Sequence, residues 1–222
     1  MIKKRSALLV CTIFTVLIML TGCFGPSPEE KIYEILEKSA DKEEIFKEQQ
    51  QPLADLEQKE SKLYDEIVSL GMEEHDKIVS KSKEALKLVG EREERLAKEH
   101  ESMKASKEES ETFETEIAAI EEDNVKKSAE KVKDVIDKRY ASYEKIYKDY
   151  EKAITYDKEL YTMLQKKDLK IEDLEAQINK NNEVYKQILS GNDEFNKLTE
   201  EYNDLKMKFY KAADIEVEQM EE

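Results

Sequence analysis

The sequence is poor in the residues that most often build catalytic and metal sites. It contains two cysteines, two histidines and no tryptophan. The histidines, His75 and His100, lie far apart and neither has a cysteine nearby, so we expect no zinc site. No glycine-rich phosphate loop or Gly-x-Ser-x-Gly motif occurs, and no carboxylate lies in an apolar stretch that would raise its pKa toward neutrality. The sequence therefore predicts a protein that is not an enzyme, with no catalytic residues, metal or cofactor.

Basic residues are too few to balance the acidic ones. The chain has 37 Lys and Arg against 53 Asp and Glu, which gives a net charge of −16. Such a surface repels nucleic acid and anionic lipid headgroups, so we expect no nucleic-acid partner. It also repels other anionic polymers. Contact with such a polymer would need neutral sugar contacts, bridging divalent cations or a local basic face.

Long hydrophobic runs are missing except at the N-terminus. After the basic residues Lys3, Lys4 and Arg5, an apolar segment extends over residues 7–20. It is about 14 residues long, whereas a transmembrane helix needs roughly 20. A basic start, a short apolar segment and small residues at its end are typical of a secretory signal peptide.

The segment ends in Leu20-Thr21-Gly22-Cys23, which resembles the lipobox of bacterial lipoproteins. In that motif the signal is cleaved before the cysteine, and the cysteine thiol is joined to diacylglycerol. The resemblance implies cleavage between Gly22 and Cys23 and lipid attachment at Cys23. The alternatives are an uncleaved anchor and an ordinary signal peptide with an incidental cysteine.

Cleavage at this point would divide the chain into three parts. Residues 1–22 would be the signal peptide, residues 23–28 a lipidated tether and residues 29–222 a helical bundle domain. The protein would then be held at the extracytoplasmic face of the cell membrane through the lipid on Cys23. Because Cys11 would leave with the signal, no thiol would remain for a disulfide.

The composition after the signal favours long helices. Charged residues make up 41% of the chain, mostly Glu and Lys, and the chain has only five Gly and three Pro. Disorder is the competing interpretation of so much charge, but regular apolar spacing argues against it. From Ile32 the chain follows two seven-residue rows, which predict an amphipathic helix. The rows are Ile32, Ser39, Phe46, Leu53, Glu60 and Ile67, and Ile35, Lys42, Gln49, Leu56, Leu63 and Leu70.

Three features predict how this first half is divided. Pro52 lies inside the pattern without changing its phase, so we expect a kink or a brief break there and not a reversal. Gly71 is a suitable helix end, and a second helix should begin near Met72. The apolar face thins over residues 90–112. We expect that stretch to bury little, as a solvated tip or as a helix end, with a reversal near residues 106–112.

The second half carries a helical seam rich in tyrosine. Its members are spaced by steps of four and three residues, with a gap at Asp157. Asp168 is expected to cap a new helix, and Gly191 with Asn192 is expected to form a turn before a last helix. The seam consists of Ile136, Tyr140, Tyr143, Tyr147, Tyr150 and Ile154, and the last apolar face of Phe195, Leu198, Tyr202, Leu205 and Phe209.

The tyrosines of the seam allow two interpretations. Their faces could stack on sugar rings, but tyrosine also fills a thin bundle with its ring buried and its hydroxyl in water. The packing role is favoured for the seam itself. Tyr156 lies off the seam and is therefore the candidate residue for a ligand face.

These patterns together predict an all-α protein. We expect an elongated up-and-down bundle of four or five long helices, with coiled-coil-like packing and short connections in one domain. A helix of about 40 residues is roughly 60 Å long, which explains the expected elongation.

Four segments carry a family resemblance. With the Leu20–Cys23 motif, the segments PEEKIYEILEKS (residues 28–39), FKEQQQPL (46–53) and LYDEIVSLGM (63–72) resemble the YkyA-type lipoproteins of Bacillus, Staphylococcus and their relatives. That family is named for binding to the cell wall. The resemblance covers the mature chain and implies a helical bundle on the outer face of a Gram-positive membrane. It supplies no catalytic or ligand residues.

Three functional hypotheses remain open from the sequence. The first is a non-enzymatic, membrane-anchored lipoprotein that contacts peptidoglycan or wall-associated proteins. The second is a structural or adaptor bundle that binds a membrane protein complex or its own copy, and a long exposed apolar stripe would mark it. The third is a small-molecule binder with a pocket among the tyrosines.

Overall fold

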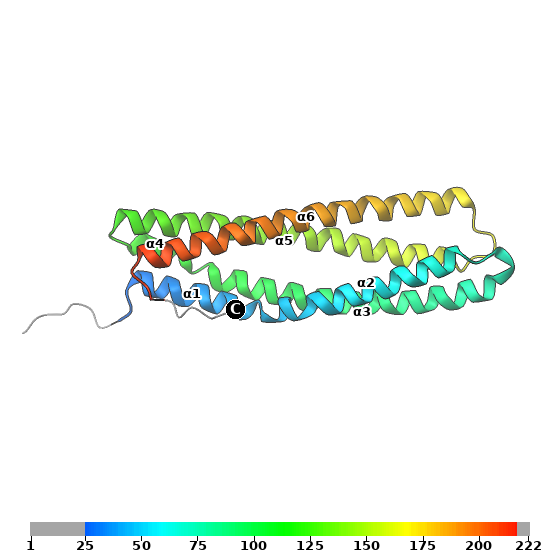
Figure 1. The fold of residues 1–222 in the computed structure, drawn as a ribbon, viewed down its shortest axis with the longest axis horizontal. Coiled ribbons are helices and arrows are strands. Elements are labelled where there is room, and N and C mark those ends of the chain that lie inside the picture. The colour runs from blue at the N-terminus through cyan, green and yellow to red at the C-terminus, as the bar shows by residue number, and fades with distance from the viewer. Residues whose placement is uncertain (1–24, 217–222) are drawn as a thin grey trace, which may run out of the picture.

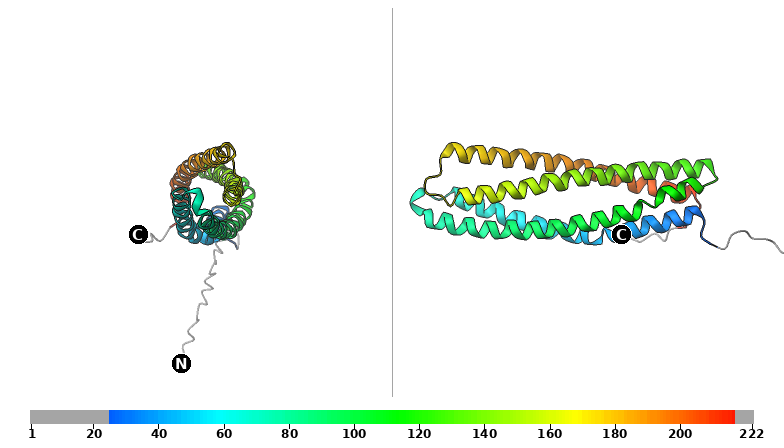
Figure 2. Two further views of the ribbon diagram at one scale, coloured as in Figure 1. Left: turned by 90° about the vertical axis from the view of Figure 1, so that its right-hand side faces the viewer. Right: turned by 180° about the vertical axis from the view of Figure 1, so that it is seen from behind.

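The computed structural model describes residues 25–216 and shows an elongated helical bundle (Figure 1). Four long rods run alternately up and down its long axis, and the end-on view shows them arranged around a common centre (Figure 2). The all-α up-and-down bundle is therefore confirmed. The elements in order are α1 (Pro28–Lys42), α2 (Glu44–Val68), the 3-10 turn η1 (Met72–Glu74), α3 (His75–Ser110), α4 (Phe113–Ala119), α5 (Asp123–Met163) and α6 (Ile171–Ala212).

The first rod consists of α1 and α2, which follow one another in the same direction (Figure 1). Ser27 caps α1, because its Oγ accepts a hydrogen bond from the Glu30 backbone while the Glu30 carboxylate accepts one from the Ser27 backbone. The rod is interrupted at Glu43, and α2 continues through Pro52. The expected break therefore lies earlier than Pro52. A single missing backbone donor at Pro52 is tolerated within this helix.

The first reversal matches the expectation. Helix α2 ends at Val68, and Gly71 lies in an extended conformation just before η1, so that α3 begins at His75. The expectation that residues 90–112 bury little is wrong, but α3 does end at Ser110, inside the range expected for a helix end. The short helix α4 follows before α5 begins. The inward face of α3 in this stretch is buried although it is polar, because polar side chains of the other helices pack against it. The buried polar residues include Arg92, Glu99, Ser102, Ser106 and Ser110.

Two expected features of the last rod are also wrong. Helix α6 runs without interruption through residues 190–192, so the chain does not turn there. Gly191 is buried against α5, where a methyl group in its place would lie 2.8 Å from Ile146 Cγ1. Its role is a close approach of two helices rather than a helix end. Asp168 lies in the turn before α6, whose N-cap is Lys170, and it does not cap that helix.

The apolar core is divided along the bundle. One cluster surrounds Ile32, Met103 and Phe209 at the end where the chain begins, and another surrounds Val89 and Leu164 toward the opposite end. The expected last apolar face is confirmed at Phe195, Tyr202 and Phe209, and the tyrosine seam is buried at Tyr140 and Tyr143 and half-buried at Tyr147 and Tyr150.

The two ends of the bundle differ in what they hold. The start of α1 and the end of α6 lie together at one end (Figure 1), where the Tyr33 and Tyr210 rings are 5.0 Å apart. We call this the anchored end, because residue 25 follows directly on the predicted lipid-bearing segment. Among residues 25–216, none of the helices has the length and apolar character needed to cross a bilayer.

Candidate functional site

The bundle is most open where α2 faces α6. Backbone contact is extensive between α5 and α6 and between α2 and α3, whereas α2 and α6 make almost none. Two cavities of about 260 Å³ each open along this side, and Glu57 lines both of them. We call this side the α2–α6 groove. Side chains from α2, α3, α5 and α6 reach it, so it is a product of the tertiary fold.

The first cavity is centred on a buried arginine, and we call it the Arg92 cavity. Only 1% of Arg92 is exposed. Its Nη1 donates to Glu60 Oε2 at 2.5 Å and to Asp157 Oδ2 at 3.2 Å, and its Nη2 donates to the Tyr185 hydroxyl at 3.0 Å. One guanidinium therefore joins α2, α3, α5 and α6 in the middle of the bundle.

Among the carboxylates that line the Arg92 cavity, Asp157 accepts hydrogen bonds from the largest number of residues. Besides Arg92, its Oδ1 accepts from Asn181 Nδ2 at 2.7 Å and its Oδ2 accepts from the Tyr185 hydroxyl at 2.6 Å. Gln177 extends this chain, because its Nε2 donates to Asn181 Oδ1 at 3.2 Å. These bonds fix the floor of the cavity, while the rings of Tyr64 and Tyr161 complete its walls.

The electrostatics of the cavity are set by burial. Burial raises the pKa of Glu60 to about 7, although the charge of Arg92 opposes the shift. Burial likewise raises the pKa of Glu57 and that of Asp157, again against the influence of Arg92. Three carboxyl groups thus face one guanidinium.

The second cavity lies next along the groove. Gln50 Nε2 donates to Glu99 Oε2 at 3.0 Å, and burial raises the pKa of Glu99 to about 7. The Tyr150 hydroxyl donates to Glu57, which separates the two cavities. The expectation that no carboxylate has a pKa near neutrality is therefore wrong. Helices distant in the sequence bury these groups, and the local sequence around each carboxylate gives no sign of it.

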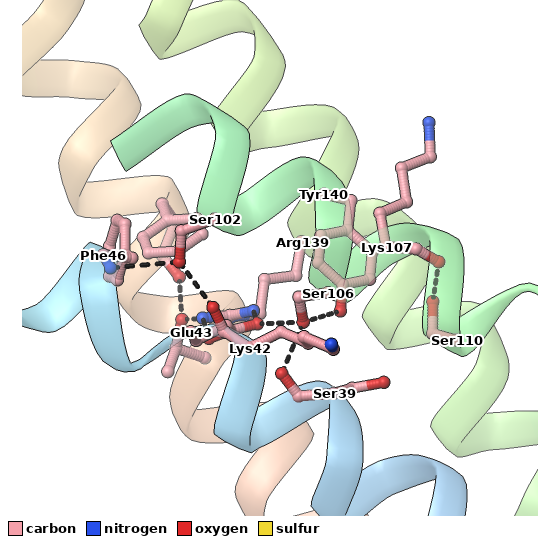
Figure 3. A network of polar contacts seen from close by, with 12 residues as sticks. Ser39, Lys42, Glu43, Phe46, Ser102, Ser106, Lys107, Ser110, Arg139 and Tyr140 are labelled. Carbon is pink, nitrogen blue, oxygen red and sulfur yellow. Dashed lines mark hydrogen bonds and ion pairs between the residues drawn. The ribbon is translucent and has the colours of Figure 1, made fainter. Parts of the chain in front are cut away.

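A third polar cluster lies nearer the anchored end and is closed (Figure 3). Arg139 Nη1 and Nη2 donate to the two carboxylate oxygens of Glu43, each at 2.7 Å, and Arg139 Nε donates to Thr199 Oγ1 at 2.9 Å. Ser106 Oγ donates to the Ser39 carbonyl at 2.7 Å. Because these groups bond to one another, we interpret this cluster as structural.

The residues singled out from the sequence lie elsewhere. Tyr156 is half-buried between α5 and α6, packed against Val184 and Ile188, and it does not line the Arg92 cavity. The ring of His100 stacks on Tyr147 at 3.7 Å. Gly22 and Cys23 precede the described residues. Within residues 25–216, no group of His, Cys, Asp or Glu side chains is arranged to hold a metal.

Sequence reasoning missed the charged residues of the cavity, but two of them carried a signal. Glu60 occupies one of the two heptad rows, and Asp157 is the gap in the tyrosine seam. A carboxylate in a row of core positions indicates a buried charge that needs a partner. That partner, Arg92, lies three residues after Val89 on the buried face of α3.

The comparisons with known proteins agree with the fold and with the family resemblance. The YkyA family model, described as "Putative cell-wall binding lipoprotein", matches residues 27–212. The "Uncharacterized lipoprotein YkyA" of Bacillus subtilis (strain 168) is 40% identical over 216 residues, which cover 97% of each chain. A 1.6 Å crystal structure of a conserved protein of unknown function from Staphylococcus aureus shares the fold with a TM-score of 0.56 at 18% identity, over 85% of this chain and 98% of that one. The chain therefore belongs to the YkyA family of lipoproteins.

Proposed function

We propose that this chain is a non-enzymatic lipoprotein, anchored at the extracytoplasmic face of the membrane through Cys23, whose α2–α6 groove contacts peptidoglycan. The family name and the Leu20–Cys23 motif support the anchor and the wall. The observation that carries the contact is the Arg92 cavity, where Tyr64, Tyr161 and Tyr185 surround a polar floor. Aromatic walls over fixed polar groups are typical of sites for small polar ligands.

The chemistry of the cavity supports binding rather than catalysis. Arg92, Asp157 and Tyr185 are engaged with one another, and no histidine lines the cavity. Ser61 lies at its wall, but neither described histidine is near enough to line the same cavity and act as its base. Among the described residues that line the Arg92 cavity, none is therefore an activated nucleophile.

The adaptor alternative receives less support from the surface. The large exposed apolar residues of α6 are Ile171, Leu189 and Met207. They are spaced by five helical turns, so about 27 Å separates each from the next. Among the described residues of α6, exposed apolar side chains are thus scattered and do not form the long stripe that a helical partner would need.

Cosedimentation with purified peptidoglycan tests the proposal. The full-length lipidated chain in detergent would be mixed with peptidoglycan, with and without its anionic polymers and with and without magnesium. We expect retention by polymer-free peptidoglycan without magnesium. Retention that requires both polymers and magnesium would indicate cation bridging by the acidic surface and would contradict contact through the groove, as would no retention at all.

A pair of tyrosine variants locates the contact. We expect Tyr64→Ala, in the wall of the Arg92 cavity, to lose retention. Tyr156→Ala is the matched control, because Tyr156 is also half-buried but lies outside that cavity. Loss in the control with retention in Tyr64→Ala would move the ligand face to Tyr156.

A further inference from the structure

Acidic side chains outnumber basic ones in the lining of the Arg92 cavity. Glu57, Glu60 and Asp157 line it together with Arg92 as the single basic side chain. Burial raises the pKa of each of the three carboxyl groups despite the nearby guanidinium. A cationic group that entered the cavity would therefore offset the cost of burying these carboxylates and lower their pKa values.

Two of these carboxylates are placed to receive such a group. Asp157 is committed to Arg92, Asn181 and Tyr185 through its two oxygens. Glu60 accepts a hydrogen bond from Arg92 through Oε2. Glu57 is half-buried and lines both cavities of the groove. The groove therefore gives access to Glu57 first and to Glu60 behind it.

A second observation also points to a missing partner. Arg92 is 1% exposed, and its Nε has no hydrogen-bond partner within residues 25–216. Burying an N–H group without an acceptor costs free energy. The described residues provide no oxygen that accepts a hydrogen bond from Arg92 Nε. A ligand oxygen that lay against Arg92 would supply such an acceptor.

The surroundings favour an organic cation over a metal ion. The described residues include no group of side chains arranged to hold a metal, and Arg92 itself occupies the centre of the carboxylates. The rings of Tyr64, Tyr161 and Tyr185 line the same space. Tyrosine faces attract ammonium groups and pack against the aliphatic chains that carry them.

The size of the cavity limits the ligand. A volume of about 260 Å³ lies below the range of about 300–1,000 Å³ that holds drug-sized ligands. The cavity can therefore accept one amino-acid-sized group and not a disaccharide. The rest of a larger ligand would lie outside, along the α2–α6 groove.

We propose that the Arg92 cavity binds a primary ammonium group on a short amide-containing chain, as presented by the free amines of peptidoglycan stem peptides. This inference rests on the proposed function. Glu57 and Glu60 accept hydrogen bonds from the ammonium group, and Tyr64 and Tyr161 pack around the chain that carries it. The proposal also explains how a protein with a net charge of −16 contacts an anionic wall, since the stem-peptide amines are cationic.

Calorimetric titration with two matched probes tests this inference. The full-length chain in detergent would be titrated with a soluble muropeptide whose stem ends in lysine, and with the same muropeptide acetylated at the lysine ε-amine. We expect the free amine to bind at least tenfold more tightly. Equal affinities, or no binding of the free amine, would overturn the inference.

A charge-removing variant and its control assign the binding to the cavity. We expect Glu57→Gln to weaken binding of the free-amine muropeptide about tenfold. Glu93→Gln removes the same charge from an exposed residue of α3, next to Arg92 but outside the cavity, and should bind as the unmodified chain does. An unchanged affinity in Glu57→Gln would overturn the assignment, and the acetylation comparison does not depend on any variant.

The two proposals fail differently. If the chain cosediments with polymer-free peptidoglycan but binds both muropeptides equally, the ammonium inference fails and the wall contact stands. If the chain does not cosediment at all, the proposed function fails.

Discussion

At the scale of single residues, the bundle is defined by arginines placed where a helical core is normally apolar. Arg92 and Arg139 are both buried. Arg92 is held by carboxylates of α2 and α5, and Arg139 by Glu43 at the junction of α1 and α2. A buried ion pair contributes little net stability when compared with apolar packing, but it penalises strongly any arrangement that separates its members. The two arginines therefore favour one register of the four rods over neighbouring ones.

The Glu43–Arg139 pair allows a direct test. We expect Arg139→Gln to lower the free energy of unfolding by about 3–5 kcal/mol, because it leaves the Glu43 carboxylate buried without its bidentate partner. Adding Glu43→Gln should recover part of this loss. Chemical denaturation would measure both, and a cost below about 1 kcal/mol for the single variant would contradict a buried, paired role.

Glu99 gives a test by pH. In the folded chain burial raises its pKa to about 7 from an ordinary value of 4.5, so between these values the folded state holds a proton that the unfolded state has lost. The unfolding free energy should therefore fall as pH rises through this window. Glu99→Gln cannot titrate, and its amide oxygen can still accept from Gln50. We expect the variant to match the unmodified chain near pH 4 and to exceed it by about 3 kcal/mol at pH 8. A difference that stays constant with pH would refute this.

Residue patterns predicted the fold better than the site. The heptad rows identified Leu53, Leu56 and Leu63 as core, and they also contained Glu60, whose position among them was a sign of a buried charge. Arg92 could not be recognised in the same way, because arginine is common on exposed helix faces. Its burial depends on Glu60 and Asp157, which come from helices far away in the sequence.

At the scale of elements, glycine in this protein has two different roles within helices. Gly90 in α3 has open space where a side chain would begin, whereas Gly191 in α6 faces Ile146 of α5. The sequence suggested a turn at Gly191 because glycine commonly ends helices. The close approach of α5 and α6 explains it instead, and no single-sequence pattern distinguishes the two cases.

Two alanine substitutions should therefore have opposite effects. Gly90→Ala should stabilise the protein by about 1 kcal/mol, the usual gain in a helix interior. Gly191→Ala should destabilise it by about 1–3 kcal/mol, because the added methyl must displace Ile146. Thermal unfolding would show a higher midpoint for the first variant and a lower one for the second. A higher midpoint for both would mean that the α5–α6 contact rearranges around the added methyl group at little cost in free energy.

At the scale of the whole molecule, the α2–α6 groove and the anchored end are separate. The chain begins at one end of the bundle (Figure 1), while the Arg92 cavity opens on its side, where α2 faces α6. Loss of the anchor should therefore leave the groove intact. This separation allows location and binding to be tested independently.

Cys23→Ala tests the anchor alone. We expect the variant to lose diacylglycerol labelling and to be misprocessed or released from membranes, while its free energy of unfolding stays unchanged. Metabolic labelling with a fatty acid and membrane fractionation would measure the first effect. Unchanged labelling and membrane retention would rule out lipidation at Cys23.

The length of α5 has a consequence for where the protein can act. Asp123 begins this helix at the anchored end, and Asp157 in the cavity lies about 50 Å farther along it. A protein held by its lipid would diffuse in the plane of the membrane and carry its cavity at an almost constant height. Its search for wall ligands would then be two-dimensional, within a thin layer whose height above the membrane is set by the helix length. This confinement would raise the effective concentration of the cavity in that layer. Removing one heptad from each rod would lower the layer by about 10 Å.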